Sequence, residues 1–518
     1  MVVKFDSKIY EQTRIAGVWV LRDMAFNVSD AYLRILASFY MLVEGFAGSI
    51  VYYGSLPLFF YYYRVSVIEY QKALIIALLP WSCRAGVGIV SDMYPIRGWH
   101  KRWYAQAAAG LLPLFLAGVV AARTVTEAIV CFAFVSTFIM VVNTLFEGQY
   151  AHKIKFDHAT NGLAAFTKGL AMVGSIGGVI VVGVLADSEE DAYRIKYGYA
   201  MCIALAVPLL VYLARYPEEV FSGDRVVSSD SKHELLSEER NARRIARKRA
   251  KPSTEECRLA GVLVGSAVLV LGLMFNISTG NIYTSFAIAG LLSTVMLGYT
   301  AWIFRDNKTL MGICIFSFSH EVFYVDVSAA MDVFYTAPAP CLIGPDFDLM
   351  FYIGWTRIIG HTIAVIVIVV FTKWFQHWNC RHVVIVGISF RIYSSVTDII
   401  IGKRWNVEAG ISDKSCYVLG DAMISPAASM FVQLALILAT TSALTKGKET
   451  LTQSIVASLQ ALGQSVSRIV GITLIYTMNV TGDLKTGVCN YDNYVPLLIV
   501  AHVIVPCFLF PLAFTVLR

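Results

Sequence analysis

The stretch GIVSDMYPIRGWHKRWY, from Gly88 to Tyr104, lies between two long apolar runs and carries five Asp, Arg, Lys or His side chains. Across the whole chain of 518 residues, only 15% of residues are charged and 57% are hydrophobic. The flanking runs, 70–91 and 103–122, each have the roughly 20 residues that a helix needs to cross a bilayer. Pro95 and Gly98 favour a tight turn between them. The stretch therefore predicts a short charged loop that joins two membrane-spanning helices.

The same pattern repeats along the chain, whose mean hydropathy of +0.63 is far above the range of soluble proteins. Because the apolar runs are continuous rather than alternating, they predict helices and not the strands of a barrel. Fourteen such runs approach the length of a membrane span. They are centred in 36–60, 70–91, 103–122, 126–146, 162–186, 197–215, 257–276, 281–304, 310–334, 349–372, 382–402, 425–444, 451–478 and 494–517. The sequence therefore predicts an all-α polytopic membrane protein.

Lys and Arg are concentrated in the loops on one side of these spans. The loops 91–104, 149–161, 305–309, 372–382 and 445–450 hold eleven Lys and Arg in 49 residues, whereas the loops on the other side hold eight in 84. Since short basic loops stay cytoplasmic, we expect both termini to be cytoplasmic. No secretory signal pattern is recognised in the polar opening segment, and the plasma membrane is the expected location.

The composition changes once, in the charged segment 217–256, which follows six spans and lacks an apolar period. Its basic part could bind anionic lipid headgroups, although a solvated connector that obeys the orientation rule is the plainer explanation. The two spans after it carry few polar side chains and are joined by a very short turn. We therefore expect a cytoplasmic N-terminal segment (1–30), a six-helix half (31–216), a cytoplasmic linker (217–256), an inserted two-helix hairpin (257–304) and a second six-helix half (305–518). Two six-helix halves around a central path are the architecture of major facilitator transporters.

Four motifs are spread over about 30–478. They are GIVSDMYPIRGWHKRWY at 88–104, NTLFEGQYAHKI at 143–154, DVFYTAPAPCLIGPDFDLMFY at 332–352 and VTDIIIGKRWNVEAGISD at 396–413. Together they resemble the folate-biopterin transporter family, and especially its protozoan branch of pteridine and folate carriers. The resemblance implies a major facilitator fold and uptake of pterins or folates, with S-adenosylmethionine as the cargo of some relatives. Asn143 stands where the family has Asp, which removes one candidate protonation site.

The resemblance also implies an inner gate. In major facilitator proteins, an Asp-and-Arg loop between the second and third spans forms contacts that must break before the inner side opens. The predicted gate residues are Asp92, Arg97, Arg102 and Glu147. The alternative is simple anchoring of the topology, which explains the basic residues but not Asp92, and Glu147 could pair with Lys153 or Arg102.

Charged side chains inside the spans give the candidate site, because each costs about 2.5–3.5 kcal/mol on insertion scales and needs a partner or a wet cavity. If 310–334 is one continuous helix, Glu321, Ser328 and Asp332 share a stripe. Asp326 then projects nearly opposite, so it needs a separate partner or marks an early end of the span. An interfacial position for this weakly apolar segment is the alternative.

Other spans add polar faces. Arg391 and Asp398 share a stripe, as either a structural ion pair or substrate contacts, and Arg357 shares a face with His361. The predicted substrate-binding residues are Tyr324, Asp332, Tyr335, Arg357, Arg391, Gln460 and Gln464. The predicted proton-coupling residues are Glu44, Glu321 and Asp332.

These features predict a secondary active transporter that moves a pteridine or folate by alternating access, coupled to protons. The alternatives are a transporter of another small metabolite such as S-adenosylmethionine, and a non-transporting scaffold or receptor. The expected partners are the small-molecule substrate, protons and membrane lipids, without nucleic acid. No nucleotide-binding or hydrolase motif appears, so we expect no enzyme. The ten Cys form no metal-ligand pattern, so no cofactor or metal is expected, and a disulfide among Cys341, Cys416 and Cys489 is left open.

Overall fold

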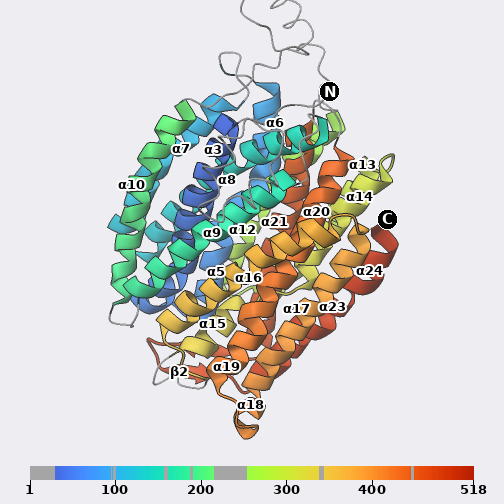
Figure 1. Cartoon of the computed structure of the whole chain (residues 1–518). Helices are drawn as coiled ribbons and strands as arrows, with labels where there is room; N and C mark the ends of the chain where they lie inside the picture. The colour runs from blue at the N-terminus through green and yellow to red at the C-terminus, as the bar shows by residue number, and fades with distance from the viewer. Residues whose placement is uncertain are drawn as a thin grey trace, which may run out of the picture.

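The computed structural model describes residues 30–94, 96, 101–156, 162–186, 191–214, 254–337, 344–444 and 448–517, which form a tilted bundle of helices (Figure 1). Within these residues, thirteen helices are long and apolar enough to cross a membrane. The predicted span at 197–215, which is not among the thirteen, is helix α10 (Ile195–Ala214), and it packs against α7 (Arg102–Ala121). The predicted all-α polytopic membrane fold is confirmed. The expected N-terminal segment up to residue 29 and most of the expected linker lie outside the described residues.

Several spans of the first half are built from more than one helical piece, with wider π-helical turns that shift the side-chain register and often mark functional sites. A capping box at Ser66 and Glu69 starts the second span. Besides α7 and α10, the elements are α3 (Asp30–Ser38), η1 (Phe39–Ala47), α4 (Gly48–Tyr53), η2 (Leu56–Tyr62), α5 (Val67–Leu78), η3 (Leu79–Cys83), α6 (Arg84–Met93), α8 (Val125–Phe156), α9 (Gly162–Leu185) and η4 (Ala192–Arg194).

The second half is also segmented, and it ends in a two-stranded sheet followed by the last span. Its elements are α14 (Lys308–Phe323), α15 (Ser328–Thr336), η5 (Met350–Trp355), α16 (Thr356–Val370), η6 (Phe371–Phe375), α17 (Cys380–Gly402), α18 (Trp405–Glu408), α19 (Asp413–Tyr417), η7 (Val418–Ala422), α20 (Met423–Ala443), α21 (Glu449–Thr477), β1 (Thr481–Asp483), β2 (Val488–Asn490), α22 (Tyr494–Ile499), η8 (Val500–Ile504), α23 (Val505–Cys507) and α24 (Leu509–Val516).

The predicted apolar hairpin is formed by α12 (Thr254–Ser278) and α13 (Ile282–Ile303), which pack against each other. Helix α12 contacts α6 and η3 of the first half, whereas α13 contacts α14 and α21 of the second. The hairpin therefore lies across the seam between the two halves. Its outer face carries large apolar side chains, including Phe275, which is 75% exposed, and this face suits contact with acyl chains.

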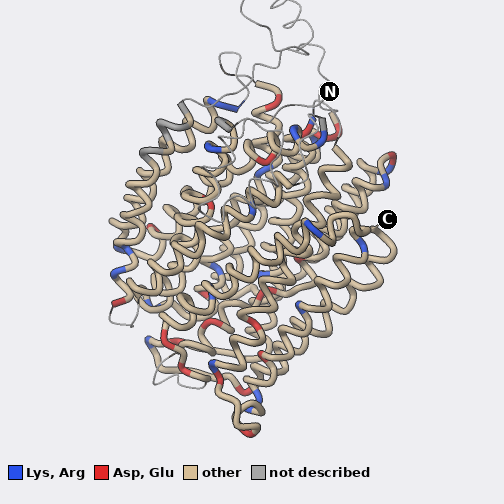
Figure 2. Tube along the Cα trace, in the orientation of Figure 1, with Lys and Arg blue, Asp and Glu red and all other residues tan. Residues whose placement is uncertain are grey.

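The two ends of the bundle are called the linker side and the strand side. Helix α10 ends and α12 begins on the linker side, and β1 and β2 lie on the strand side (Figure 1). The first and last described helices both reach the linker side, because Lys153 near the end of α8 lies over the Tyr32 ring and the Leu517 carbonyl accepts a hydrogen bond from Arg381 at the start of α17. Figure 2 shows Lys, Arg, Asp and Glu mainly toward the two ends, with a few inside the bundle.

The span 310–334 is not one continuous helix, contrary to the sequence-based assumption. Helix α14 ends at Phe323 and α15 begins at Ser328, so residues 324–327 interrupt the span. A backbone without helical hydrogen bonds is tolerated at membrane depth only where protein or water supplies partners. The predicted stripe of Glu321, Ser328 and Asp332 therefore does not follow from helical periodicity.

Glycines of α9 allow its close packing against the first span. A Cβ atom at Gly174 would overlap the Met41 carbonyl group, and one at Gly178 would overlap the Phe46 carbonyl oxygen. These two glycines therefore permit the close approach of the two helix backbones.

The strands β1 and β2 pair antiparallel, and β1 packs against α5 and α15. Cys489, on β2, is disulfide-bonded, whereas Cys416 is a free thiol. Cys341 lies outside the described residues. Because β1 contacts α5 of the first half and α15 of the second, the sheet covers the strand side of helices from both halves.

Candidate functional site

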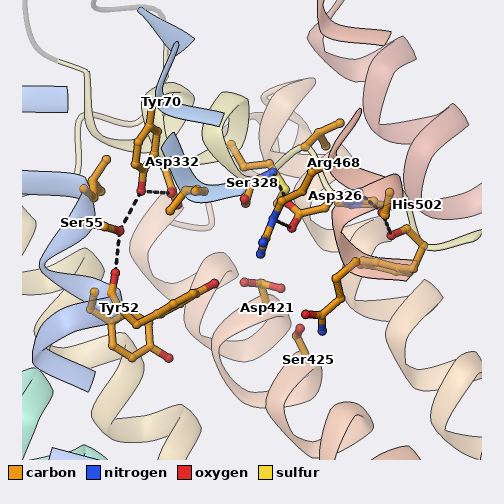
Figure 3. A pocket seen from close by; sticks show the side chains of 18 of the residues that line it. Tyr52, Ser55, Tyr70, Asp326, Ser328, Asp332, Asp421, Ser425, Arg468 and His502 are labelled. Atoms are coloured by element: carbon orange, nitrogen blue, oxygen red, sulfur yellow. Dashed lines mark hydrogen bonds and ion pairs between the residues drawn. The ribbon is translucent and has the colours of Figure 1, made fainter. Parts of the chain in front are cut away.

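A cavity of about 340 Å³ lies between the two halves, at the break between α14 and α15 (Figure 3). We call it the central cavity. The first half contributes residues of α4, η2 and α5, and every span of the second half contributes at least one residue. The predicted site residues that line it are Glu321, Tyr324, Asp332, Arg357, Arg391 and Gln464. The cavity therefore brings together most of the second-half candidates.

Polar side chains replace the hydrogen bonds that the broken helix loses. Gln71 of α5 donates to the Asp326 carbonyl at 2.7 Å and accepts from the Ala329 backbone N–H at 3.2 Å. The Ser467 hydroxyl donates to the Tyr324 carbonyl and accepts from the Asp326 N–H, both at 2.9 Å. These two residues come from different halves, so the break is supported from both sides.

Asp326 has the separate partner that its predicted position required. Its carboxylate lies 2.7 Å from Nε of Arg468 on α21, and the Arg468 side chain is 6% exposed. Gly471, one turn further along α21, lies so close that a Cβ atom there would overlap the Asp326 carbonyl oxygen. The ion pair and this close approach together fix the break against α21. Arg468 is a residue that the sequence analysis missed.

Two other arginines of the cavity have no carboxylate partner among the described residues. The Arg391 guanidinium carbon lies 3.4 Å from the ring centroid of Tyr324. The Arg357 guanidinium carbon lies 5.5 Å from the ring centroids of both Tyr53 and Tyr352. In each arginine, Nε is buried without a hydrogen-bond partner in the described part of the chain. Aromatic faces therefore hold both cations without neutralising them.

The expected ion pair between Arg391 and Asp398 is not formed. Asp398 is 1% exposed and accepts a hydrogen bond of 2.6 Å from the Tyr335 hydroxyl. Tyr335 is fully buried against Phe347 and Tyr417, so it belongs to an aromatic cluster and does not line the central cavity. Sequence spacing placed Arg391 and Asp398 on one face, but the Tyr324 ring, from the break between α14 and α15, holds the guanidinium instead.

The acidic candidates of the second half differ in their partners. Asp332 accepts a hydrogen bond from the Tyr70 hydroxyl at 3.3 Å (Figure 3). It accepts a second from the Tyr352 hydroxyl at 2.7 Å. Glu321 accepts one from Nε2 of Gln460 at 3.0 Å and lies 3.3 Å from Nδ1 of His320. Asp332 forms no ion pair within the described residues. Hydrogen bonds therefore stabilise Asp332, as they do Asp421 in the same cavity, whose carboxylate accepts from the hydroxyls of Ser394 and Tyr417.

The predicted residues of the first half form a separate buried cluster on the linker side of the central cavity. Arg84 lies 2.9 Å from the Glu147 carboxylate and donates to the Asn143 carbonyl oxygen at 3.2 Å. Lys168 lies 3.2 Å from Glu44 and 3.7 Å from Glu147. The Asn143 amide also donates to Glu44. Two carboxylates and two cations balance in charge around the neutral Asn143.

The predicted inner gate is only partly described. Asp92 lies near the end of α6 and Arg102 at the start of α7, while Arg97 lies outside the described residues. Glu147 pairs with Arg84 and Lys168 instead of Lys153 or Arg102. The halves meet on the linker side through other residues, because His152 Nδ1 lies 3.0 Å from Glu449 and Lys155 donates to the Ser442 carbonyl.

The sequence analysis also missed residues whose role depends on contacts between helices. Tyr53, Tyr70, Asp421 and His502 line the central cavity, and His502 lies 4.5 Å from Tyr324, ring to ring. A His inside the predicted span 494–517 was a usable signal for His502, whereas Asp421 lies just before the predicted span 425–444. The tyrosines gave none, because aromatic residues are common in lipid-facing and buried positions alike.

Residues 44–518 match the model of the BT1 family over most of the chain. The chain belongs to the BT1 family. This family includes folate-biopterin transporters, so this BT1 protein is a membrane transporter by family. No curated protein matches the chain.

Solved transporter structures share the fold of this BT1 protein. A POT family transporter in complex with 5-aminolevulinic acid is 10% identical, with a TM-score of 0.61 over 96% of this chain and 98% of that chain. A mutant of the nucleoside transporter NupG is 11% identical, with a TM-score of 0.56 over 93% and 98%. The xylose transporter XylE from E. coli is 14% identical, with a TM-score of 0.53 over 93% and 98%. The expected major facilitator fold is confirmed, and at these identities the likeness concerns the fold alone.

Proposed function

We propose that this BT1 protein is a secondary active transporter that carries a pteridine or a folate by alternating access, coupled to protons. The observation that carries the proposal is the pair of buried arginines, Arg357 and Arg391, which line the central cavity without a carboxylate partner among the described residues. A buried cation is costly unless it is compensated. An anionic group on the transported molecule supplies that compensation.

The remaining lining suits a flat heterocycle with an anionic tail. Tyr52 and Tyr53 from the first half and Tyr324 from the second offer aromatic faces. Asp332 faces the same cavity and can accept hydrogen bonds from ring N–H and amino groups. Folate carries both kinds of group, a donor-bearing pteridine edge and a tail with two carboxylates.

Contacts on both sides of the central cavity support an alternating-access cycle. On the strand side, the Tyr61 hydroxyl of the first half donates to the Thr336 carbonyl of the second at 2.6 Å. On the linker side, the halves meet at His152 and Glu449. Opening one side at a time requires only the contacts on that side to break. This is how two-half transporters rock between their two states.

Asp332 is the leading proton carrier, with Glu321 and Glu44 as the other two candidates. Asp332 forms no ion pair with a described cation, whereas Glu44 already lies 3.2 Å from Lys168. Each unit of pH gradient then contributes about 1.4 kcal/mol per proton, or a tenfold accumulation of neutral cargo.

We further propose a plasma-membrane location with the linker side and both termini in the cytoplasm, and domain limits at 31–216, 217–256, 257–304 and 305–518. The lysine and arginine bias of the linker-side loops supports this orientation.

Uptake by vesicles reconstituted with the purified protein tests the function. Labelled folate, biopterin and S-adenosylmethionine are supplied separately, with and without an imposed pH gradient. We expect gradient-driven uptake of folate or biopterin. Uptake of S-adenosylmethionine alone would show that the substrate is not a pteridine or folate. No uptake of any of the three compounds would favour a scaffold or receptor.

A further inference from the structure

A second polar cavity, of about 180 Å³, lies between the central cavity and the linker-side contacts. We call it the linker-side chamber. Its polar lining includes Arg84 and Lys168 of the first half and Ser317, Gln433, Gln453 and Gln460 of the second. Both halves therefore contribute to the chamber, as they do to the central cavity.

Helix α21 connects the two cavities by a line of polar side chains. Gln453 and Gln460 line the chamber, Gln464 lines both cavities, and Ser467 lines the central one. Spacings of seven, four and three residues keep these side chains near one face of a helix. At 1.5 Å per residue, the line from Gln453 to Ser467 is about 21 Å long. A molecule that leaves the central cavity toward the linker side thus meets hydrogen-bonding groups along its path.

The chamber has hydrogen-bonding groups that the described part of the protein leaves unused. The side-chain oxygen of Gln453, in a residue 7% exposed, has no hydrogen-bond partner among the described residues. The same holds for the hydroxyl of Ser317, which is 1% exposed. Buried polar groups in native proteins are nearly always paired. Two unpaired groups in residues that line one cavity indicate a ligand with complementary donors and acceptors.

The charge of the chamber wall selects the kind of group that fits. Arg84 and Lys168 are offset by Glu147 and Glu44, so the wall attracts neither anions nor cations strongly. The glutamines offer both donors and acceptors. A neutral, flat group with N–H donors and ring acceptors is therefore the matching chemistry. Ligand sites usually enclose about 300–1,000 Å³, so the smaller chamber holds only part of a substrate.

We propose that the linker-side chamber is a second binding position for the transported molecule, which receives its neutral heterocyclic end as the molecule passes between the central cavity and the linker side. This inference rests on the proposed function. Gln464, which borders both cavities, is the residue at which the molecule passes from one position to the other. Gln453 and Ser317 hold the heterocycle in the chamber.

The test measures transport separately for substrate presented to each face. Trypsin cleavage within the basic segment 243–251 reports which vesicles expose the linker side. In Gln453→Met and Ser317→Ala, we expect the half-saturating concentration at the linker side to rise about five- to tenfold, while the value at the strand side stays within twofold. Ser465→Ala is the matched control, because Ser465 is equally buried but bonds only to the Ala461 carbonyl of its own helix.

Equilibrium binding to each purified variant shows whether the central cavity is intact. An unchanged linker-side value in both Gln453→Met and Ser317→Ala, with transport by the wild type, would overturn the second position alone. An equal rise at both faces would also overturn it, since that result indicates general damage. Wild-type protein that transports no pteridine or folate would instead overturn the proposed function.

Discussion

The guanidinium of Arg391 lies 3.4 Å from the centre of the Tyr324 ring, and the ring of His502 is stacked on the same tyrosine at a centroid distance of 4.5 Å and an angle of 14°. Two planar groups this close to one face would overlap, so they lie on opposite faces of the ring. Tyr324 is the first residue after α14, where the helix has already ended. The break in the span thus places an aromatic ring where it can hold a cation inside the central cavity.

Replacing Arg391 tests the anion-binding part of the site. A charge-assisted hydrogen bond contributes about 1.5–3 kcal/mol, so Arg391→Gln should raise the Kd of folate about ten- to hundredfold. Binding of biopterin, which lacks the carboxylate tail, should change by less than fivefold. Arg381→Gln is the control, since Arg381 bonds to the Leu517 carbonyl away from the cavity. Equal losses for both ligands would contradict an anion site.

Replacing Asp332 tests proton coupling. Asp332→Asn keeps an acceptor for the tyrosine hydroxyls but cannot lose a proton, so accumulation driven by a pH gradient should disappear while substrate exchange at equal pH persists. Uptake and exchange in the same vesicles separate the two activities. Asp348→Asn, an exposed position on the strand side, serves as the control. Should Asp332→Asn, Glu321→Gln and Glu44→Gln all retain gradient-driven uptake, the assignment of the proton site is wrong.

The ion pair between Asp326 and Arg468 is expected to hold the broken helix in place. Removal of one partner of a buried pair costs about 3–5 kcal/mol, so Arg468→Met should lower the Tm of the protein in detergent by several degrees. Asp326→Asn combined with Arg468→Met removes both charges and should recover part of the loss. A Tm of the double variant below that of either single variant would argue against direct coupling.

The charge balance around Asn143 predicts the effect of a third carboxylate. Asn143→Asp adds an acid to a cluster of two carboxylates and two cations, and the extra buried charge is relieved when a proton is bound. The variant should therefore be less stable than the wild type at pH 8 and closer to it at pH 5. Melting curves at the two pH values measure the difference, and Asn143→Leu gives the effect of losing the amide alone. A pH-independent loss would show that the added carboxylate stays ionised.

The linker-side contact predicts a shift in the open population. Glu449→Gln weakens the contact with His152, so the linker side should open more often. In a variant whose native cysteines are replaced, a thiol introduced as Ala457→Cys in the chamber wall should react faster with a small water-soluble reagent when Glu449→Gln is added. Lys414→Gln, which removes an exposed contact on the strand side, should leave that rate unchanged.

The amino-acid sequence predicts the spans well, because each one must bury about 20 apolar residues in the bilayer. Such runs can be recognised in the sequence without knowing which helices pack against them. It also identifies Arg357, Arg391 and Asp332, since charge within a span is costly wherever it occurs. The α14–α15 break could not be predicted, because the groups that support it, Gln71 and Ser467, come from distant helices. Helical periodicity therefore misplaced Tyr335. The shared face of Arg391 and Asp398 predicted an ion pair that is not formed.

Gln71 links the strand side of the cavity to the break, since the side chain is fully buried and bonds both the Asp326 carbonyl and the Ala329 N–H across the two halves. In the proposed cycle, a movement of α5 away from α15 would leave a bare carbonyl and a bare amide in the second half. Water must reach them at once, because no apolar medium can satisfy them. Admission of solvent to the transport path is therefore part of the opening step itself, and a dry, opened strand side is not an accessible state of this protein.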